Sequence, residues 1–193
     1  MARLRVDCPW DAEQTHASLV SYLVEETCET VEAIETGSDA DLREELGDLL
    51  LQVVFHAQIS REQADGFDLD DVARGIADKL VSRHPHVFAT DDVPEDLHYT
   101  WEQRKALEKG RTSVLQGIPE QLSALARAEK IIGRARSRRV AVELAAETVT
   151  AKEIGEQMLT LVSRAQASGV DAEQATRAAV RRLETRVRAA ESG

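Results

Sequence analysis

The sequence is poor in cysteine, proline and aromatic residues, and each scarcity excludes a class of protein. Among its 193 residues there are two cysteines, Cys8 and Cys28, too few for a disulfide framework or a zinc site. Four prolines and ten glycines favour helices over a turn-rich β fold. Because aromatic residues make up only 4%, the core has to be built from Leu, Val, Ile and Ala. We therefore predict an all-α fold, an antiparallel helical bundle.

Long apolar segments and an excess of positive charge are also missing. No apolar run approaches the ~18 residues that a membrane span requires, and the first ten residues contain no apolar signal-peptide region. We therefore expect a cytoplasmic protein that does not bind membranes. The net charge of −11 argues against general affinity for nucleic acid polymers. It still permits a nucleotide ligand, because bound cations and local basic residues reverse the sign at a site.

Several well-known catalytic signatures are absent as well. The sequence has no G-x-x-x-x-G-K-[ST] loop, which excludes a P-loop NTPase, and no Rossmann glycine fingerprint. It also lacks G-x-S-x-G and H-E-x-x-H. His84 and His86 flank Pro85 without a nearby third ligand, so we expect them to shape an irregular loop rather than bind zinc.

Apolar residues recur at helical spacing along most of the chain. The pattern predicts helices over about 15–36, 40–63, 69–83, 100–109, 123–139, 151–168 and 171–190. Gly37 and Ser38 form a short link between the first two, which predicts an antiparallel helix pair. Thr100 and Gln103 have the spacing of a capping box, which predicts a helix start at Thr100.

The most informative feature is a concentration of acidic residues in the first predicted helix pair. Ten carboxylates lie within the 24 residues from Glu25 to Asp48, in two near-copies of one pattern, residues 25–29 and 44–48. Residues three and four apart share a helix face. The apolar run 49–55 predicts a buried helix, on which carboxylates are costly unless they are paired or bind metal. We therefore predict a magnesium site, with a solvated, salt-bridged acidic face as the alternative.

Two pairs of residues further along the chain have the properties expected of a phosphate and base contact. Lys79 and Arg83 are four apart on one predicted helix, and Trp101 and Lys105 are four apart on the next. A cation cluster that faces a polyphosphate is commonly completed by such basic side chains. The alternatives are a solvated face for Lys79 and Arg83, and a core position for Trp101.

These motifs, taken in order, resemble the MazG family of nucleoside triphosphate pyrophosphohydrolases, within the all-α NTP pyrophosphatase superfamily. The matching stretches are residues 8–16, 25–29, 42–50, 78–88 and 101–105. The resemblance covers about residues 7 to 109 and implies hydrolysis of NTPs or dNTPs between the α- and β-phosphates. The products would be NMP and pyrophosphate, with Mg²⁺ as the required ion and Mn²⁺ as a substitute.

The resemblance also implies roles for particular residues, and homodimers of helical bundles. The implied metal ligands are Glu26, Glu29, Glu45 and Asp48, and the neighbouring carboxylates that support the site or act on water are Glu25 and Glu44. The implied nucleotide contacts are Lys79, Arg83, Trp101 and Lys105. The biological task would be sanitation of the nucleotide pool or its control under stress.

The C-terminal part contains a weak echo of the acidic motif. Glu153–Glu156 and the largely apolar residues that follow resemble Glu45–Asp48 and the residues after it. No Glu-x-x-Glu motif precedes Glu153 in this part of the chain. We therefore expect a MazG-like catalytic domain over 1–112 and a degenerate second copy over 113–193. Two alternative functions remain open: a dUTP or phosphoribosyl-ATP pyrophosphohydrolase of the same superfamily, and a non-catalytic dimeric scaffold or regulator.

Overall fold

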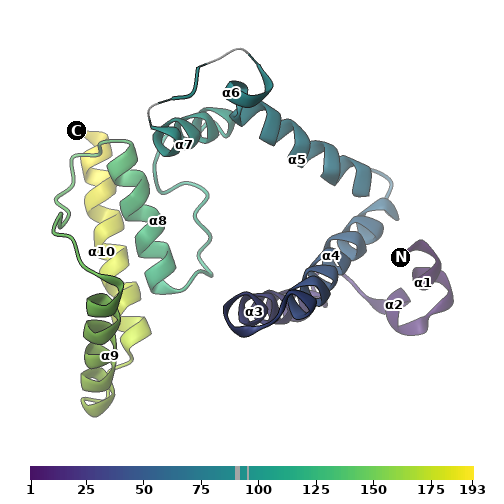
Figure 1. Cartoon of the computed structure of the whole chain (residues 1–193), viewed down its shortest axis with the longest axis horizontal. Coiled ribbons are helices and arrows are strands. Elements are labelled where there is room, and N and C mark those ends of the chain that lie inside the picture. Colours follow the sequence, from purple (N-terminus) through teal and green to yellow (C-terminus); the bar gives the residue numbers. More distant parts are fainter. Residues whose placement is uncertain (90–91, 95) are drawn as a thin grey trace. The chain divides into compact units, whose positions relative to one another are not determined.

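The structure is a computed structural model that describes residues 1–89, 92–94 and 96–193. Within these ranges it contains ten helices and no strand, which confirms the all-α prediction (Figure 1). The chain divides into two compact units, Met1–Ala89 and Thr90–Gly193. The boundary that we predicted after residue 112 came from the resemblance to MazG domains and not from contacts within the fold. That division into domains stays a prediction. No helix of the described part is both long and apolar enough to cross a bilayer.

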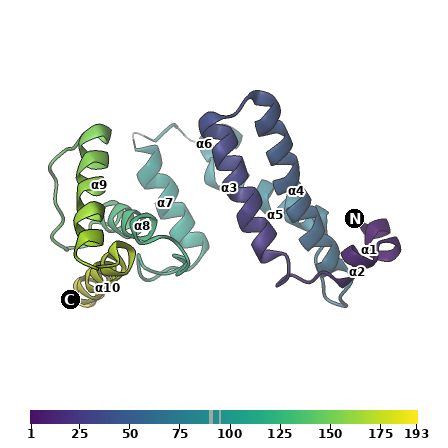
Figure 2. The same ribbon diagram turned by 90° about the horizontal axis from the view of Figure 1, so that it is seen from below.

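The first unit is organised around a helical hairpin. Its helices are α1 (Ala2–Asp7), α2 (Pro9–Glu13), α3 (Val20–Thr36), α4 (Asp39–Arg61), α5 (Leu69–Arg83) and α6 (Pro85–Phe88). As predicted, α3 and α4 lie side by side and antiparallel (Figure 2). Ser38 caps α4 and forms a capping box with Asp41. A Cβ atom at Gly37 would approach the backbone of Ala33 to 2.8 Å, so the tight link requires glycine.

One arginine fastens the N-terminal segment to the end of the hairpin. The Arg5 guanidinium donates to the Glu62 carboxylate at 2.6 Å and to the backbone carbonyls of Ala12 at 3.0 Å and Gln14 at 2.9 Å. Beside this contact, Leu19 packs on Phe55 and Ile59 in a small buried core. Arg5 therefore satisfies carbonyls that a loop would otherwise leave to water.

The second unit has its own core. It consists of α7 (Leu97–Glu108), α8 (Ala124–Ser137), α9 (Ala151–Ala167) and α10 (Ala172–Ser192). Its buried apolar residues are Val114, Ile118, Ile131, Val180 and Val187. Between α8 and α10 lies a buried ion pair, Arg127–Glu184, with an N–O distance of 2.7 Å. Arg127 also donates to the carbonyls of Ile118 and Pro119, so the pair is embedded in further hydrogen bonds.

Three local predictions were wrong, each because a side chain or proline acted on the backbone. Residues 15–19 form a turn instead of helix, since the Thr15 and Ser18 hydroxyls accept each other's backbone N–H groups. Helix α7 begins at Leu97, because Asp96 and not Thr100 supplies the cap. The segment after His84 is a short helix, for which Pro85 is suited as the first residue.

The predicted burial of α4 was also wrong within the first unit. Leu46 is 51% exposed and Leu50 is 58% exposed, and the buried residues are confined to the C-terminal half of the helix. Cys28, on the neighbouring helix α3, is exposed as well. The reason is that α3, α5 and the N-terminal segment cover only part of α4, which leaves the rest of its apolar surface exposed within this unit.

The contacts of Arg5 predict that Arg5→Met lowers the free energy of unfolding more than Arg3→Met does. We expect Arg5→Met to lower the free energy of unfolding by about 1–3 kcal/mol, because several acceptors lose their donor at once. Arg3→Met should change it by less than about 0.5 kcal/mol, since the Arg3–Asp7 pair is solvent-exposed. Urea unfolding at pH 7 measures both values. Equal effects would contradict the fastening role.

The same contact gives the effect a pH dependence. The hydrogen bond from Arg5 holds the pKa of Glu62 below its ordinary value. A carboxylate with a lowered pKa stabilises the fold at pH values above its unfolded pKa, and this contribution disappears as the pH falls through the folded value. The difference between wild type and Arg5→Met should therefore shrink in acid.

Candidate metal centre

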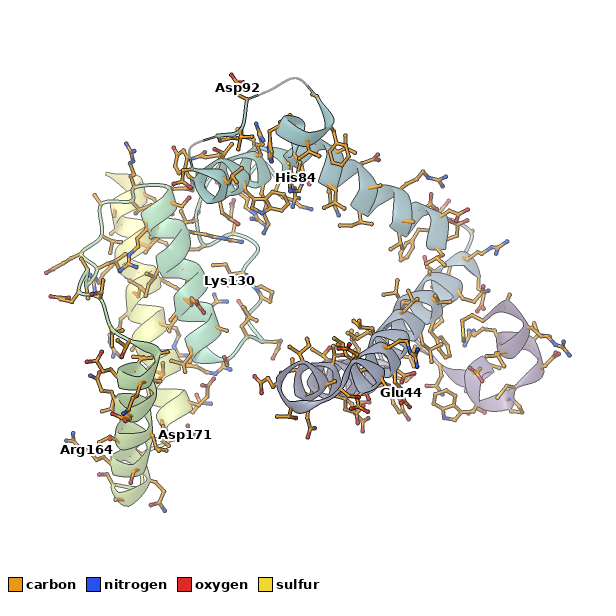
Figure 3. All side chains as sticks on the ribbon, in the orientation of Figure 1. Glu44, His84, Asp92, Lys130, Arg164 and Asp171 are labelled. Atoms are coloured by element: carbon orange, nitrogen blue, oxygen red, sulfur yellow. The ribbon has the colours of Figure 1, made fainter. Side chains whose placement is uncertain are left out.

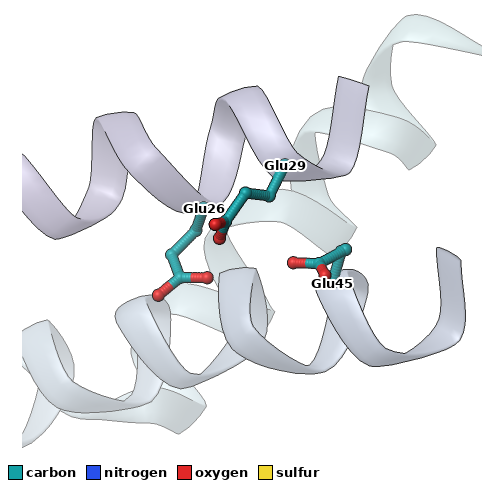
Figure 4. A group of neighbouring side chains, drawn as sticks. All are labelled: Glu26, Glu29 and Glu45. Atoms are coloured by element: carbon teal, nitrogen blue, oxygen red, sulfur yellow. The ribbon is translucent and has the colours of Figure 1, made fainter. Parts of the chain in front are cut away.

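Three carboxylates from two helices converge in the first unit. Glu26 and Glu29 of α3 and Glu45 of α4 each contribute one oxygen to a group whose members all lie within 4.8 Å of one another. Figure 4 shows the side chains extending from the two helices toward a common region. The arrangement follows from the sequence: Glu26 and Glu29 are three apart on one face of α3, and the short link brings the start of α4 alongside.

The electrostatics of the group are those of like charges held together. Partial burial raises the pKa of Glu26, and the negative charges of Asp48, Glu29 and Glu45 raise it further. The pKa of Glu45 is raised in the same way, first by desolvation and then by the charges of Glu29 and Asp48. Each shift means that the ionised form is less favourable here than in water. The folded protein therefore holds these carboxylates together at a cost.

The other predicted acidic residues surround this group. Asp48 lies outside the three converging oxygens, but its charge acts on both Glu26 and Glu45. Glu25 adds its charge to the surroundings of Glu26, and Glu44 does so for Glu45. Glu44 is exposed on α4, where Figure 3 labels it. The structure thus brings three of the six predicted acidic residues together, and the other three act on them through their charges.

No basic side chain of the described residues neutralises this cluster by an ion pair. The salt bridges between described residues of the first unit involve the carboxylates of Asp7, Glu62 and Asp71, none of which belongs to the cluster. Among the described residues the acidic face is therefore not salt-bridged, and the choice between a solvated face and a metal site stays a prediction. Converging carboxylate oxygens without cationic partners are the donor set of a hard divalent cation. The residues therefore fit such an ion, and the cluster is compatible with metal binding.

The predicted nucleotide contacts are distributed over two helices. Lys79 and Arg83 lie on α5, in the same unit as the carboxylates. Trp101 and Lys105 lie on α7 of the other unit, where the Lys105 ammonium is 3.6 Å from the Glu102 carboxylate. The structure thus brings together the acidic residues, and the roles of the four nucleotide-contact residues stay predictions.

The sequence analysis missed a buried polar residue beside the cluster. Gln52 is only 5% exposed, and its Oε1 atom has no hydrogen-bond partner among the described residues. It lies one helical turn after Asp48 on α4, and it interrupts the apolar run 49–55. A lone polar residue inside such a run was a visible signal, because a buried amide needs partners.

Known proteins are similar in sequence to the part of the chain that carries the acidic cluster. Residues 14–88 match the MazG nucleotide pyrophosphohydrolase domain. The chain is 50% identical over 196 residues to an uncharacterized 26.1 kDa protein of Streptomyces cacaoi, a match that covers 99% of this chain and 79% of that protein. It is 41% identical over 193 residues to the nucleoside triphosphate pyrophosphohydrolase of Mycobacterium tuberculosis, covering 99% of this chain and 56% of that protein.

A further relative is the nucleoside triphosphate pyrophosphohydrolase of Escherichia coli K12. It is 48% identical over 129 residues, which cover 64% of this chain and 49% of that protein. The chain thus spans about half the length of these two curated relatives that carry an enzyme name. The described fold is all-α, and a carboxylate cluster lies on the hairpin within the matched segment. The chain belongs to the MazG family, which confirms the resemblance found in the sequence.

The raised pKa values predict that removing one charge stabilises the metal-free protein. A carboxylate whose pKa is raised on folding destabilises the fold once the pH exceeds that pKa. We therefore expect Glu45→Gln to raise the thermal unfolding midpoint at pH 7 in the presence of a chelator. The gain should diminish as the pH falls and wild-type Glu45 takes up a proton. Glu35→Gln, an exposed position of α3 outside the cluster, is the matched control. An equal gain in both variants would show that only net charge matters.

Proposed function

We propose that the chain hydrolyses nucleoside triphosphates between the α- and β-phosphates, giving a nucleoside monophosphate and pyrophosphate. The observation that carries this proposal is the convergence of Glu26, Glu29 and Glu45 on a hairpin that lies within the MazG match. The names of the relatives from M. tuberculosis and E. coli support the same activity. Because the chain covers about half of each, the activity is proposed for this chain rather than transferred.

The proposal includes a magnesium requirement. Glu26, Glu29, Glu45 and Asp48 would hold the ion, and Mn²⁺ would substitute for it. Support comes from the hard oxygen donors and from the unfavourable charge density that a divalent cation would relieve. When bound, such an ion neutralises phosphate oxygens and makes a nearby water more acidic.

The chain's own residues have separate tasks in the proposed reaction. Glu25 or Glu44, carboxylates beside the ligand group, would accept a proton from the water that attacks the α-phosphorus. The bond between the α-phosphorus and the bridging oxygen breaks, and pyrophosphate leaves with that oxygen. Lys79 and Arg83 would bind phosphate oxygens and offset the charge of the leaving group. On sequence grounds, Trp101 and Lys105 would contact the nucleotide as well.

The proposed enzyme is a homodimer. The apolar side chains of the hairpin that remain exposed in the single chain are Val20, Leu23, Val24, Val31, Ile34, Leu46, Leu50, Leu51 and Val53. On α4 the positions 46, 50 and 53 recur at helical spacing, so they form one stripe. Extended apolar surface of this kind is characteristic of a protein–protein interface. A second copy of the hairpin is the partner that we propose.

The biological role and the architecture complete the proposal. A cytoplasmic enzyme of this activity would clear non-standard nucleotides or lower nucleotide levels under stress. Residues 1–112 would form the catalytic domain, and 113–193 a degenerate second copy.

A dUTP or phosphoribosyl-ATP pyrophosphohydrolase would share the metal site and differ in its relative kcat/KM across nucleotides. A non-catalytic scaffold would show no turnover at all.

The activity is tested by product analysis. Incubation with NTPs and Mg²⁺ should release pyrophosphate and NMP, which ³¹P NMR distinguishes from orthophosphate and NDP. Glu45→Gln should reduce kcat/KM by about 100-fold or more, because metal-assisted charge stabilisation contributes several kcal/mol. Glu35→Gln should retain wild-type activity. NDP as the product would contradict the proposed bond cleavage, and an active Glu45→Gln variant would contradict the proposed metal site.

The dimer is tested independently of the activity. Light scattering during gel filtration should give twice the chain mass of 21.3 kDa for wild type. Leu50→Glu should shift the protein toward monomer, since it places a charge in the apolar stripe. Leu159→Glu changes another exposed leucine, on α9 outside the hairpin, and should leave the mass unchanged. A monomeric wild type would exclude the proposed interface.

A further inference from the structure

A group of aromatic rings on the first unit combines a buried support with an open surface. Trp10 of α2 packs edge-to-face with Tyr22 of α3, with the ring centroids 5.8 Å apart. It packs in a similar way with Phe55 of α4, at 6.4 Å. Phe55 is buried, whereas Trp10 is 50% exposed and Tyr22 is 38% exposed. The indole therefore rests on a buried ring and leaves half of its own surface open within this unit.

The backbone around Trp10 is held in place by two side chains. The Gln14 side-chain amide donates to the Trp10 carbonyl at 2.9 Å. Arg5 donates to the carbonyls of Ala12 and Gln14, in the segment that follows Trp10. A side chain that is already positioned loses little conformational freedom when a ligand packs on it. The open indole is thus a preorganised contact surface.

Trp10 lies on the side of the hairpin where the carboxylates converge. Tyr22 is four residues before Glu26, so both project from one face of α3. Phe55 is seven residues after Asp48, which places these two on one face of α4. Trp10 contacts Tyr22 and Phe55 and therefore lies on this shared side. Four residues of helix, a rise of about 6 Å, separate Tyr22 from Glu26.

The apolar side chains proposed for the dimer face elsewhere on α3. Val20 and Val24 lie two residues before and after Tyr22, a spacing that turns them to the opposite side of the helix. A second copy packed on these valines would therefore lie on the side away from Tyr22. The open aromatic surface needs a different partner, and the nearest proposed ligand is the substrate at the carboxylate cluster.

The chemistry of this surface selects one part of a nucleoside triphosphate. Indole and phenol rings gain most from a planar aromatic partner that stacks on them. Only the base of the substrate is such a group, and one sugar joins it to the α-phosphate. A stacking surface about one helical turn from the proposed metal ligands suits that order of groups. Because every base has an aromatic face, stacking of this kind tolerates all of them.

We propose that Trp10, supported by Tyr22, stacks on the nucleobase of the triphosphate whose phosphates face the carboxylate cluster. The identity of this ligand rests on the proposed function of the same site. Stacking on the base is the same in the bound substrate and in the transition state. Loss of the indole therefore raises KM and leaves kcat close to its wild-type value.

Fluorescence of the full-length Trp101→Phe variant tests the contact directly, because Trp10 is then its only tryptophan. The probe is an ATP analogue with a methylene group between the α- and β-phosphorus atoms, which cannot be cleaved there, titrated in the presence of Mg²⁺. The analogue should quench the emission in a saturable manner. Inorganic tripolyphosphate, which has the charge but no base, should leave the emission largely unchanged. Equal responses to the two ligands, or no response to the analogue, would overturn the proposal.

Kinetics separate the base contact from the activity itself. Trp10→Leu keeps an apolar side chain on Phe55 and removes the stacking ring, so KM for ATP and for GTP should rise about tenfold, with kcat within about twofold. Phe67→Leu changes a similarly exposed aromatic residue between α4 and α5 and should preserve both constants. An unchanged KM of Trp10→Leu would overturn the base contact and leave the pyrophosphohydrolase activity standing.

The two experiments also fail independently. A wild-type protein without turnover would contradict the proposed function, while quenching by the uncleavable analogue would still report binding of the base at Trp10. Should Trp10→Leu fail to fold, the fluorescence titration remains decisive, because it uses the native Trp10 side chain.

Discussion

The antiparallel packing of α3 on α4 is the constraint on which the first unit depends. Close approach at Gly37 and the cap at Ser38 fix where α4 begins relative to the end of α3. That register places Glu45 opposite Glu29 and Glu26, at a cost visible in their raised pKa values. A hairpin selected for stability alone would alternate charges across this seam. Repulsion retained at one place in the fold is compatible with the metal site that we propose.

The hairpin is incomplete in two respects that have one origin. Its acidic face lacks ion-pair partners among the described residues, and its apolar face lacks a cover within the first unit. Both surfaces belong to the same two helices, so the proposed metal site and the proposed dimer would form on one rigid element. The Arg5 contact at the far end of α4 supports this element from the N-terminal segment. Sites on packed helices hold their geometry better than sites on loops.

The sequence predicted the hairpin and its acidic cluster because both depend on short-range spacing. Glu26 and Glu29 share a helix face, and the short link of Gly37 and Ser38 leaves room only for a tight turn. It failed where a pattern has two physical explanations. An apolar run such as 49–55 indicates burial, but it does not say whether the same chain or a second copy supplies the cover. Local hydrogen bonds between Thr15 and Ser18 likewise outweighed helical propensity at the start of α3.

A small cavity of the second unit, lined by three arginines, was beyond any spacing rule, since its residues come from positions 102 to 138 and meet only through the packing of α7 on α8. It also differs from the acidic cluster in how its charge can be relieved. Crowded carboxylates can take up protons as the pH falls, which is the meaning of the raised pKa values of Glu26 and Glu45. Guanidinium groups stay protonated at every physiological pH. Arg134 is instead compensated by the Glu102 carboxylate, and Arg111 and Arg138 are half-buried side chains whose charges water can screen.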